Sequence, residues 1–193
     1  ITAIATGLVA GSYSVVATDA NGCTTPESVT ITEPTVLTSS ISSNNVICNG
    51  GTGDATIATS GGSGAIAYLW NDGQTTEVAT GLVAGSYSVV ATDGNGCTTP
   101  ESVTITEPTV LSSSISSNNV ICNAGTGDAT ITTLGGTATI TYLWSDGQTT
   151  AIASGLSAGS YSVVATDANG CTTPESVTIT EPTVLTSSIS SNN

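Results

Sequence analysis

A stretch that recurs three times constrains this chain more than any other feature of its sequence. Gly81–Pro108 reads GLVAGSYSVVATDGNGCTTPESVTITEP. Gly7–Pro34 repeats it with one substitution and Gly155–Pro182 with two, at a constant spacing, since 81 − 7 = 74 and 155 − 81 = 74. Near-identical copies at a fixed period are typical of a repeat array, so the structural unit has 74 residues.

The Glu-Pro-Thr tripeptides at 33–35, 107–109 and 181–183 are natural boundaries between units. Proline ends ladder pairing and holds the residue before it extended. We therefore expect the C-terminal part of a unit at 1–34, complete units at 35–108 and 109–182, and the first strand of the next unit at 183–193. Such short linkers predict a linear array, and we expect this chain to be a window from a longer secreted one.

Each complete unit shows the alternation of apolar and polar residues that is typical of short strands, with no helical periodicity. Asp72-Gly73 predicts a hairpin turn, with the next segment as the return strand. The expected strands are Val36–Ser42, Asp54–Thr59, Ala65–Trp70, Thr75–Ala79, Ser86–Thr92 and Ser102–Thr106. The pattern predicts an all-β fold of tandem immunoglobulin-like antiparallel β-sandwiches. The expected core is Trp70, Tyr68, Tyr87, Val89, Ile57, Ile105 and Leu82, with Trp144, Tyr142 and Tyr161 in the next unit.

Composition excludes several classes of function. The chain has no Lys, Arg or His, and its 14 Asp and Glu give a formal charge of −14. Nucleic acids and anionic lipids require a cationic surface, so we expect neither as a partner. No apolar run is long enough to insert into a membrane. Without His or Lys the usual catalytic bases and amine nucleophiles are missing, so we expect neither an enzyme nor a cofactor.

The five cysteines lie at alternating spacings of 25 and 49 residues, and two pairings fit this pattern. Cys48 with Cys97 and Cys122 with Cys171 would close a loop in each unit and leave Cys23 unpaired. Cys23 with Cys48 and Cys97 with Cys122 would cross the Glu-Pro-Thr junctions instead. We favour the first pairing, because strands that run away from a junction on both sides would separate the second set of sulfurs. Structural disulfides imply an oxidising compartment, hence the cell exterior or the periplasm.

Two acidic turns are weak candidates for calcium sites. Asp93 and Asn95 carry oxygen side chains two residues apart, and so do Asp167 and Asn169. The later acidic ligands of a calcium loop are missing. We therefore interpret both segments as tight turns and predict no metal.

An ordered set of motifs resembles a known family over essentially the whole chain. In the unit 35–108 they are Cys48-x-Gly50, Gly61-Gly62, Tyr68-x-Trp70, Asp72-Gly73, Gly81-Leu82-x-Ala84-Gly85-x-Tyr87, Asp93-x-Asn95-Gly96-Cys97 and Glu107-Pro108. This succession is similar to the SprB-type repeat of Bacteroidetes surface adhesins and gliding-motility filaments. The resemblance implies an extracellular, cell-surface fibre of immunoglobulin-like domains.

From the repeats and this resemblance we expect a structural part of a secreted bacterial surface filament or adhesin stalk, acting in attachment or gliding. Its partners would be the neighbouring repeats of the same chain, with identical chains of a filament as further candidates. The alternative is a module whose Thr-rich faces bind a glycan or a solid surface, with or without Ca²⁺. Repetition favours the stalk, because a ligand site usually stands out in one unit and none stands out here.

Overall fold

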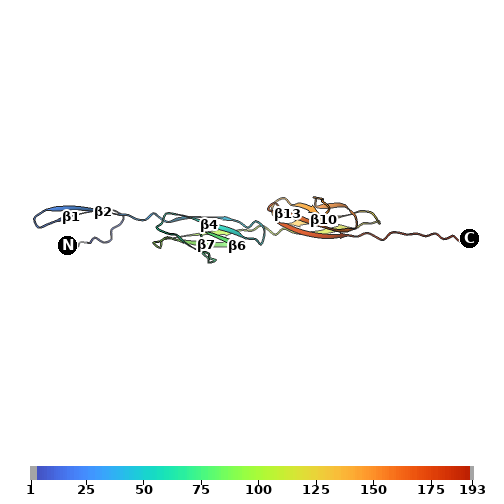
Figure 1. Ribbon diagram of the computed structural model, residues 1–193, viewed down its shortest axis with the longest axis horizontal. Coiled ribbons are helices and arrows are strands. Elements are labelled where there is room, and N and C mark those ends of the chain that lie inside the picture. The colour runs from blue at the N-terminus through green and yellow to red at the C-terminus, as the bar shows by residue number, and fades with distance from the viewer. Residues whose placement is uncertain (1–3, 192–193) are drawn as a thin grey trace. The chain divides into compact units, whose positions relative to one another are not determined.

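The structure, a computed structural model, describes residues 4–191, and all the regular elements of this part are β-strands (Figure 1). Its contacts define two compact units. One comprises residues up to Ile41 together with Ile57–Glu77 and Ser88–Ser102, and the other comprises Ser42–Thr56, Val78–Tyr87 and the chain from Val103 onward. The second unit holds the whole repeat 109–182 and also the stretch around Cys48. The repeat boundaries at the Glu-Pro-Thr junctions stay a prediction.

The strands repeat the same order with the sequence period. They are β1 (Gly11–Thr18) and β2 (Thr24–Ile31), then β3 (Thr38–Asn44), β4 (Gly53–Ser60), β5 (Ala67–Trp70), β6 (Val78–Leu82), β7 (Gly85–Thr92) and β8 (Thr98–Ile105), and finally β9 (Ser112–Asn118), β10 (Gly127–Leu134), β11 (Thr141–Trp144), β12 (Ile152–Leu156), β13 (Gly159–Thr166) and β14 (Thr172–Ile179). The sheet orders are β1-β2, β3-β4-β6, β5-β7-β8, β12-β10-β9 and β11-β13-β14. The predicted all-β fold of antiparallel sheets is confirmed.

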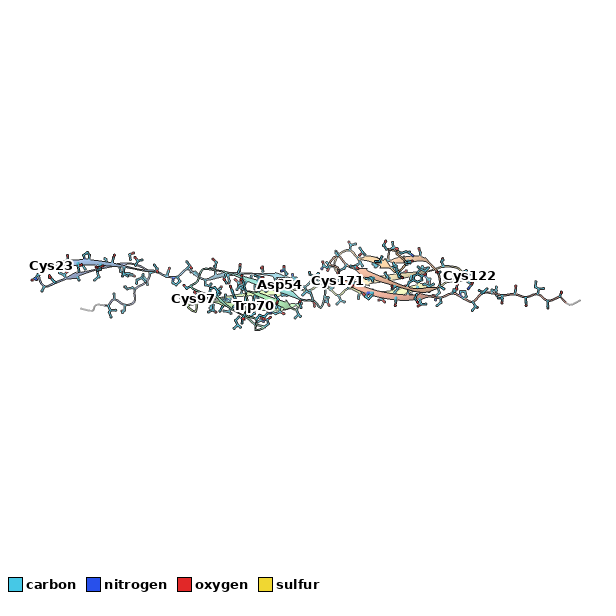
Figure 2. The ribbon with its side chains drawn as sticks, in the orientation of Figure 1. Cys23, Asp54, Trp70, Cys97, Cys122 and Cys171 are labelled. Atoms are coloured by element: carbon cyan, nitrogen blue, oxygen red, sulfur yellow. A yellow bond between two sulfur atoms is a disulfide. The ribbon has the colours of Figure 1, made fainter. Side chains whose placement is uncertain are left out.

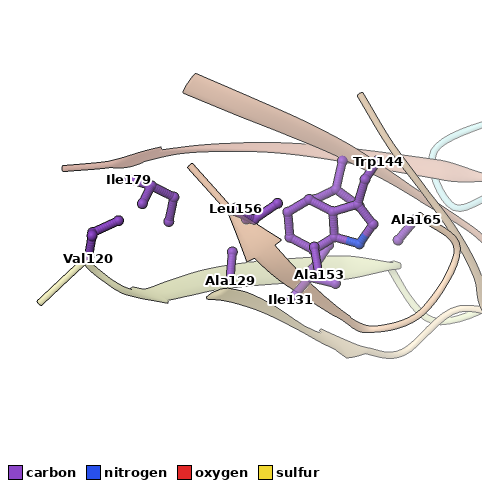
Figure 3. Packing of buried hydrophobic residues seen from close by; sticks show 9 residues of the cluster. Val120, Ala129, Ile131, Trp144, Ala153, Leu156, Ala165 and Ile179 are labelled. Carbon is purple, nitrogen blue, oxygen red and sulfur yellow. The ribbon is translucent and has the colours of Figure 1, made fainter. Parts of the chain in front are cut away.

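The repeat 109–182 is a sandwich whose two sheets enclose one apolar core (Figure 3). Trp144 of β11 is the largest side chain in it and is almost completely buried. One sheet adds Ala129, Ile131, Ala153 and Leu156, and the other adds Val163, Ala165 and Ile179. The counterparts Trp70, Ile57, Leu82, Val89 and Ile105 are buried in the preceding repeat, whereas the tyrosines expected in the core are only half-buried.

The arrangement matches an immunoglobulin-like sandwich in two details. A buried tryptophan stands on the first strand of the sheet β11-β13-β14, as in that fold. Tyr161, near the start of β13, donates its hydroxyl to the carbonyl of Ser157, at 3.2 Å. Tyr13 and Tyr87 make the same bond to Val9 and Val83. This is the tyrosine corner of immunoglobulin-like domains, which fixes the turn into the strand.

The predicted hairpin after Trp70 is wrong, although its turn forms. Gly73 adopts a φ of 90°, and its N–H donates to Trp70 O at 3.0 Å. The following strand does not return along β5, because β5 pairs with β7 while β6 pairs with β4. The indole N–H of Trp70 donates to Thr76 O at 2.8 Å. Since the ring is buried, this bond draws the chain away from β5, and the segment crosses to the other sheet.

The hairpin β1-β2 shows what the second sheet contributes to each sandwich. It has the sequence of β7-β8 and β13-β14, but within the described residues no further strand pairs with it. Val15 is consequently 63% exposed, while Val89 and Val163 at the same position are each 1% exposed. The apolar face of this strand pair is therefore encoded for burial under the first half of a unit.

Replacing Trp144 tests the proposed core. We expect Trp144→Ala to lower the free energy of unfolding by about 3–5 kcal/mol, because it removes the largest buried side chain and leaves a cavity. The neighbouring Leu143 points outward and is 60% exposed, so Leu143→Ala should change stability by less than about 0.5 kcal/mol. Chemical denaturation followed by circular dichroism measures both, and equal effects would contradict the packing.

Candidate functional site: the junction between repeats

One disulfide joins successive repeats in the structure. Cys48 of the repeat 35–108 is bonded to Cys171 of the repeat 109–182, with a Cα–Cα distance of 5.6 Å and a sequence separation of 123 residues. Both cysteines are half-buried. The remaining cysteines of the described chain, at positions 23, 97 and 122, are exposed thiols. The junction is the one place where this chain shows covalent chemistry, and we treat it as the candidate site.

Hydrogen bonds to the end of its own repeat hold the loop that carries Cys48. Val46 N–H donates to Thr106 O at 3.0 Å, and Thr106 N–H donates to the side-chain oxygen of Asn45 at 2.9 Å. The Glu-Pro dipeptide supplies the rest: Gly50 N–H donates to a Glu107 carboxylate oxygen at 2.8 Å, and the Asn49 amide donates to Pro108 O at 3.0 Å. Cys48 is thereby fixed beside the last residues of its repeat.

The carboxylate of Asp167 organises the turn that carries Cys171. Its Oδ1 accepts the N–H groups of Asn169 and Cys171, both at 2.9 Å, and its Oδ2 accepts Thr137 N–H at 2.9 Å. The Asp167 N–H donates in return to Cys171 O at 3.0 Å. Since Thr109 O accepts Gly136 N–H next to this turn, Cys171 is placed at the start of its repeat.

A direct hydrogen bond accompanies the disulfide across the junction. The side-chain amide of Asn169 donates to Ile47 O at 3.0 Å. The Cys171 sulfur also lies 3.5 Å from Ile47 O, which is a contact only, because a disulfide sulfur carries no proton. Ile47 is 64% exposed, whereas Ile121, its counterpart one period later, is 90% exposed. The following repeat therefore covers part of the Cys48 loop.

The structure corrects the predicted pairing of Cys48 with Cys97 and of Cys122 with Cys171. Cys171 directly precedes β14, whereas the Cys122 loop is bonded to the far end of that strand through Thr180 O and Pro182 O. Eight residues of strand span about 26 Å, while a disulfide needs Cα atoms within about 7 Å. Figure 2 shows Cys122 and Cys171 at opposite ends of this sandwich. The alternative pairing of Cys23 with Cys48 and Cys97 with Cys122 is not formed either.

Sequence analysis missed Asn169 and Glu107 as parts of the junction. The sequence carried a signal for both, since Asn-Gly-Cys and Glu-Pro recur in each copy at fixed distances from the cysteines. The turn interpretation of Asn169 explained the backbone of this segment but gave its side-chain amide no partner. The glutamate was used only to mark a boundary.

The weak calcium candidates form hydrogen-bonded turns. Asn95 N–H and Cys97 N–H donate to Asp93 Oδ1 at 3.0 and 2.8 Å, as their counterparts do at Asp167. Gly96 and Gly170 adopt the positive φ values of 87° and 83° that such turns require. The described residues contain no group of three or more His, Cys, Asp or Glu that could hold a metal ion.

These hydrogen bonds shift the acidity of both aspartates, which are each 5% exposed. The N–H of Cys97 is the largest influence on Asp93 and, with those of Ser63 and Asn95, holds the pKa of its carboxyl below the ordinary value although burial opposes the shift. Burial is the largest influence on Asp167 and raises its pKa. The N–H groups of Cys171, Thr137 and Asn169 together outweigh burial, so that the pKa of Asp167 also lies below the ordinary value.

Comparisons with known proteins support the repeat and its fold. The family model of the SprB repeat matches residues 40–75 and 114–149, which confirms the resemblance over these two stretches. No curated protein sequence matches the chain. Among solved structures, extracellular domains 3–5 of Drosophila OTK are similar at 14% identity and a TM-score of 0.39, covering 90% of this chain and 72% of that one. Dpr2 Ig1-Ig2 in complex with DIP-Theta Ig1-Ig3 is similar at 12% identity and a TM-score of 0.32, covering 88% and 72%.

No helix of the described residues is long and apolar enough to cross a membrane.

The observed pairing predicts how far the chain extends under force. Pulled by its ends, the oxidised chain should reach a full extension about 430 Å shorter than the reduced chain, because 123 residues at about 3.5 Å each lie behind the disulfide. Cys48→Ser and Cys171→Ser should abolish the difference. Cys97→Ser and Cys122→Ser are matched controls that should preserve it. A loss of the difference in Cys97→Ser would restore the pairing within repeats.

The aspartate turns predict sensitivity to acid. A carboxyl whose pKa is lowered by folding contributes stability above its unfolded pKa and loses it as the pH falls through the folded value. We therefore expect the melting temperature to fall below about pH 4. Asp167→Asn should lower the melting temperature at neutral pH and reduce its further loss in acid, whereas the exposed Asp146→Asn should retain that loss. Thermal unfolding from pH 2 to 7 checks this, and an unchanged acid profile in Asp167→Asn would contradict it.

Proposed function

We propose that this chain is a structural segment of a secreted bacterial surface filament or adhesin stalk, acting in surface attachment or gliding. The observation that carries the proposal is the Cys48–Cys171 disulfide, which ties one repeat to the next in addition to the peptide backbone. A protein that transmits tension between a cell and a surface gains from such a second connection. A disulfide also persists outside the cell and is rare in the reducing cytosol.

The surface chemistry supports the same role. A chain without a single Lys, Arg or His and with a formal charge of −14 repels other copies of itself and the anionic cell envelope. Such repulsion keeps a projecting fibre extended and soluble. The neighbouring repeats of the same chain are its first partners, and the surface that the whole protein attaches to would contact other parts of it. We propose no catalytic role.

The two matches to the SprB repeat, a repeat of cell-surface proteins, set the proposed location. Both lie at the same position in successive units, since 114 − 40 = 74. The resemblance therefore extends to the periodicity, which is the property that a stalk requires.

Labelling of intact cells tests the location. An antibody raised against this chain should bind unpermeabilised cells that produce the protein, and electron microscopy should place the gold label along fibres that project from the surface. An antibody against a cytosolic protein of the same cells is the control for envelope integrity. Label that appears only after permeabilisation would refute the proposal.

A further inference from the structure

The two bonded cysteines occupy positions that recur in each repeat. Cys122 is the counterpart of Cys48, since 122 − 48 = 74, and Cys97 is the counterpart of Cys171, since 171 − 97 = 74. Each complete repeat thus carries a first-strand cysteine, Cys48 or Cys122, which follows its first strand. It also carries a last-strand cysteine, Cys97 or Cys171, which directly precedes its last strand.

The unbonded cysteines are held in the same local structures as the bonded ones. In the loop of Cys122, Ala124 N–H donates to Glu181 at 3.0 Å and the Asn123 amide donates to Pro182 O at 3.1 Å, matching the bonds around Cys48. Cys97 N–H donates to Asp93 at 2.8 Å, matching the bond of Cys171 to Asp167. Both sulfurs are exposed. No rearrangement of loop or turn is needed before either cysteine bonds.

The first and last strands of a repeat run in parallel, side by side. Ser113 Oγ contacts Thr173 Oγ1 at 2.9 Å near the start of β9 and β14, and Val120 N–H donates to Thr180 O at 3.0 Å beyond their ends. The offset is 60 residues at both points, so the two strands advance together. The same offset joins Ser39 to Thr99 and Val46 to Thr106 in the preceding repeat. The last-strand cysteine therefore lies where a repeat begins and the first-strand cysteine where it ends.

We propose that the Cys48–Cys171 disulfide is one step of a ladder, in which the first-strand cysteine of each repeat bonds the last-strand cysteine of the next. Cys122 then bonds the counterpart of Cys171 in a following repeat, and Cys97 bonds the counterpart of Cys48 in a preceding one. This pairing does not depend on the proposed function. Each bond forms as two thiols lose two protons and two electrons to the disulfide of a thiol–disulfide oxidoreductase, which leaves as the dithiol.

The ladder changes which residues carry tension. A continuous covalent path runs from Thr35 through β3 to Cys48, crosses the disulfide to Cys171, and follows β14 to Pro182. This path contains residues 35–48 and 171–182, which are 26 residues in place of the 148 in two periods of backbone. In the ladder two such paths alternate along the array, and the 49 residues between the cysteines of each repeat lie outside both.

Both paths consist largely of strands that are already extended. A strand advances about 3.3 Å per residue, close to the limit of about 3.3–3.6 Å for any chain. Loss of the other four strands of a repeat therefore adds almost no length. Oxidised repeats act as an inextensible fibre, whereas reduced repeats lengthen about six-fold on unfolding, because 74 residues replace the 13 per repeat on each path.

A lengthened chain tests the ladder. Six further copies of residues 109–182 are inserted after Pro182 of the full chain, which adds twelve cysteines and recreates the same junction each time. Thiol titration under denaturing, non-reducing conditions should find three free thiols, the same number as in the parent chain. Cys122→Ser should raise the count by one, because it strands its partner, and Cys23→Ser should lower it by one.

The other outcomes overturn the ladder. About fifteen free thiols in the lengthened chain would mean that the Cys48–Cys171 bond is isolated, and about one would mean pairing within repeats. The same chain pulled by its ends should reach about one quarter of the full extension that it reaches after reduction. A ratio of about four fifths, or of about two fifths, would refute the ladder in favour of the isolated bond or of pairing within repeats, respectively. Neither result bears on cell-surface labelling, so the ladder and the proposed location fail separately.

Discussion

The parallel, side-by-side run of the first and last strands is the constraint on which the rest of this structure depends. Hydrogen bonds at both ends of the strands hold β9 against β14, and Glu175 accepts the hydroxyl of Ser113 between them at 2.9 Å. Because the strands advance together, the segment after β9 and the segment before β14 must lie at opposite ends of the sandwich. A cysteine in each can meet only a cysteine of another repeat.

The sequence predicted the fold better than the site, for a physical reason. Period, alternation and turn residues are local signals, and they suffice for a sandwich with Trp144 in its core. Disulfide pairing depends on which strands run in parallel, which is a property of the assembled sandwich. The immunoglobulin-like topology inferred from sequence already implied that Cys122 and Cys171 are separated by the length of β14, but spacing alone favoured the nearer pair. The crossing of β6 to the other sheet escaped prediction similarly, because an Asp-Gly turn specifies a reversal of the chain and not the strand that it joins.

The absence of cationic side chains explains the many carboxylates that bind backbone N–H groups. Asp93 and Asp167 accept N–H groups within their turns, and Glu107 and Glu181 accept them from the cysteine loops. Asp54 accepts the side-chain amide of Asn44 instead. With no salt bridges available, neutral donors and the disulfide are what remains to hold a junction between acidic repeats. Such bonds are short-ranged and directional, so they fix geometry where charge pairs would mainly supply attraction.

A head-to-tail junction also explains where the copies agree. The interface is heterologous, since the Cys48 loop on one repeat meets the Asp167 turn on the next, and each repeat must therefore carry both halves. Gly81–Pro108 and Gly155–Pro182, which supply the aspartate turn, the last strand and the Glu-Pro dipeptide, differ at two positions. Differences gather instead at 60–67 and 134–141, where Thr137 supports Asn169 but most side chains face solvent. Uniformity thus follows the parts of the repeat that meet a neighbour, because a change in either half of the interface alters every junction that the altered repeat makes.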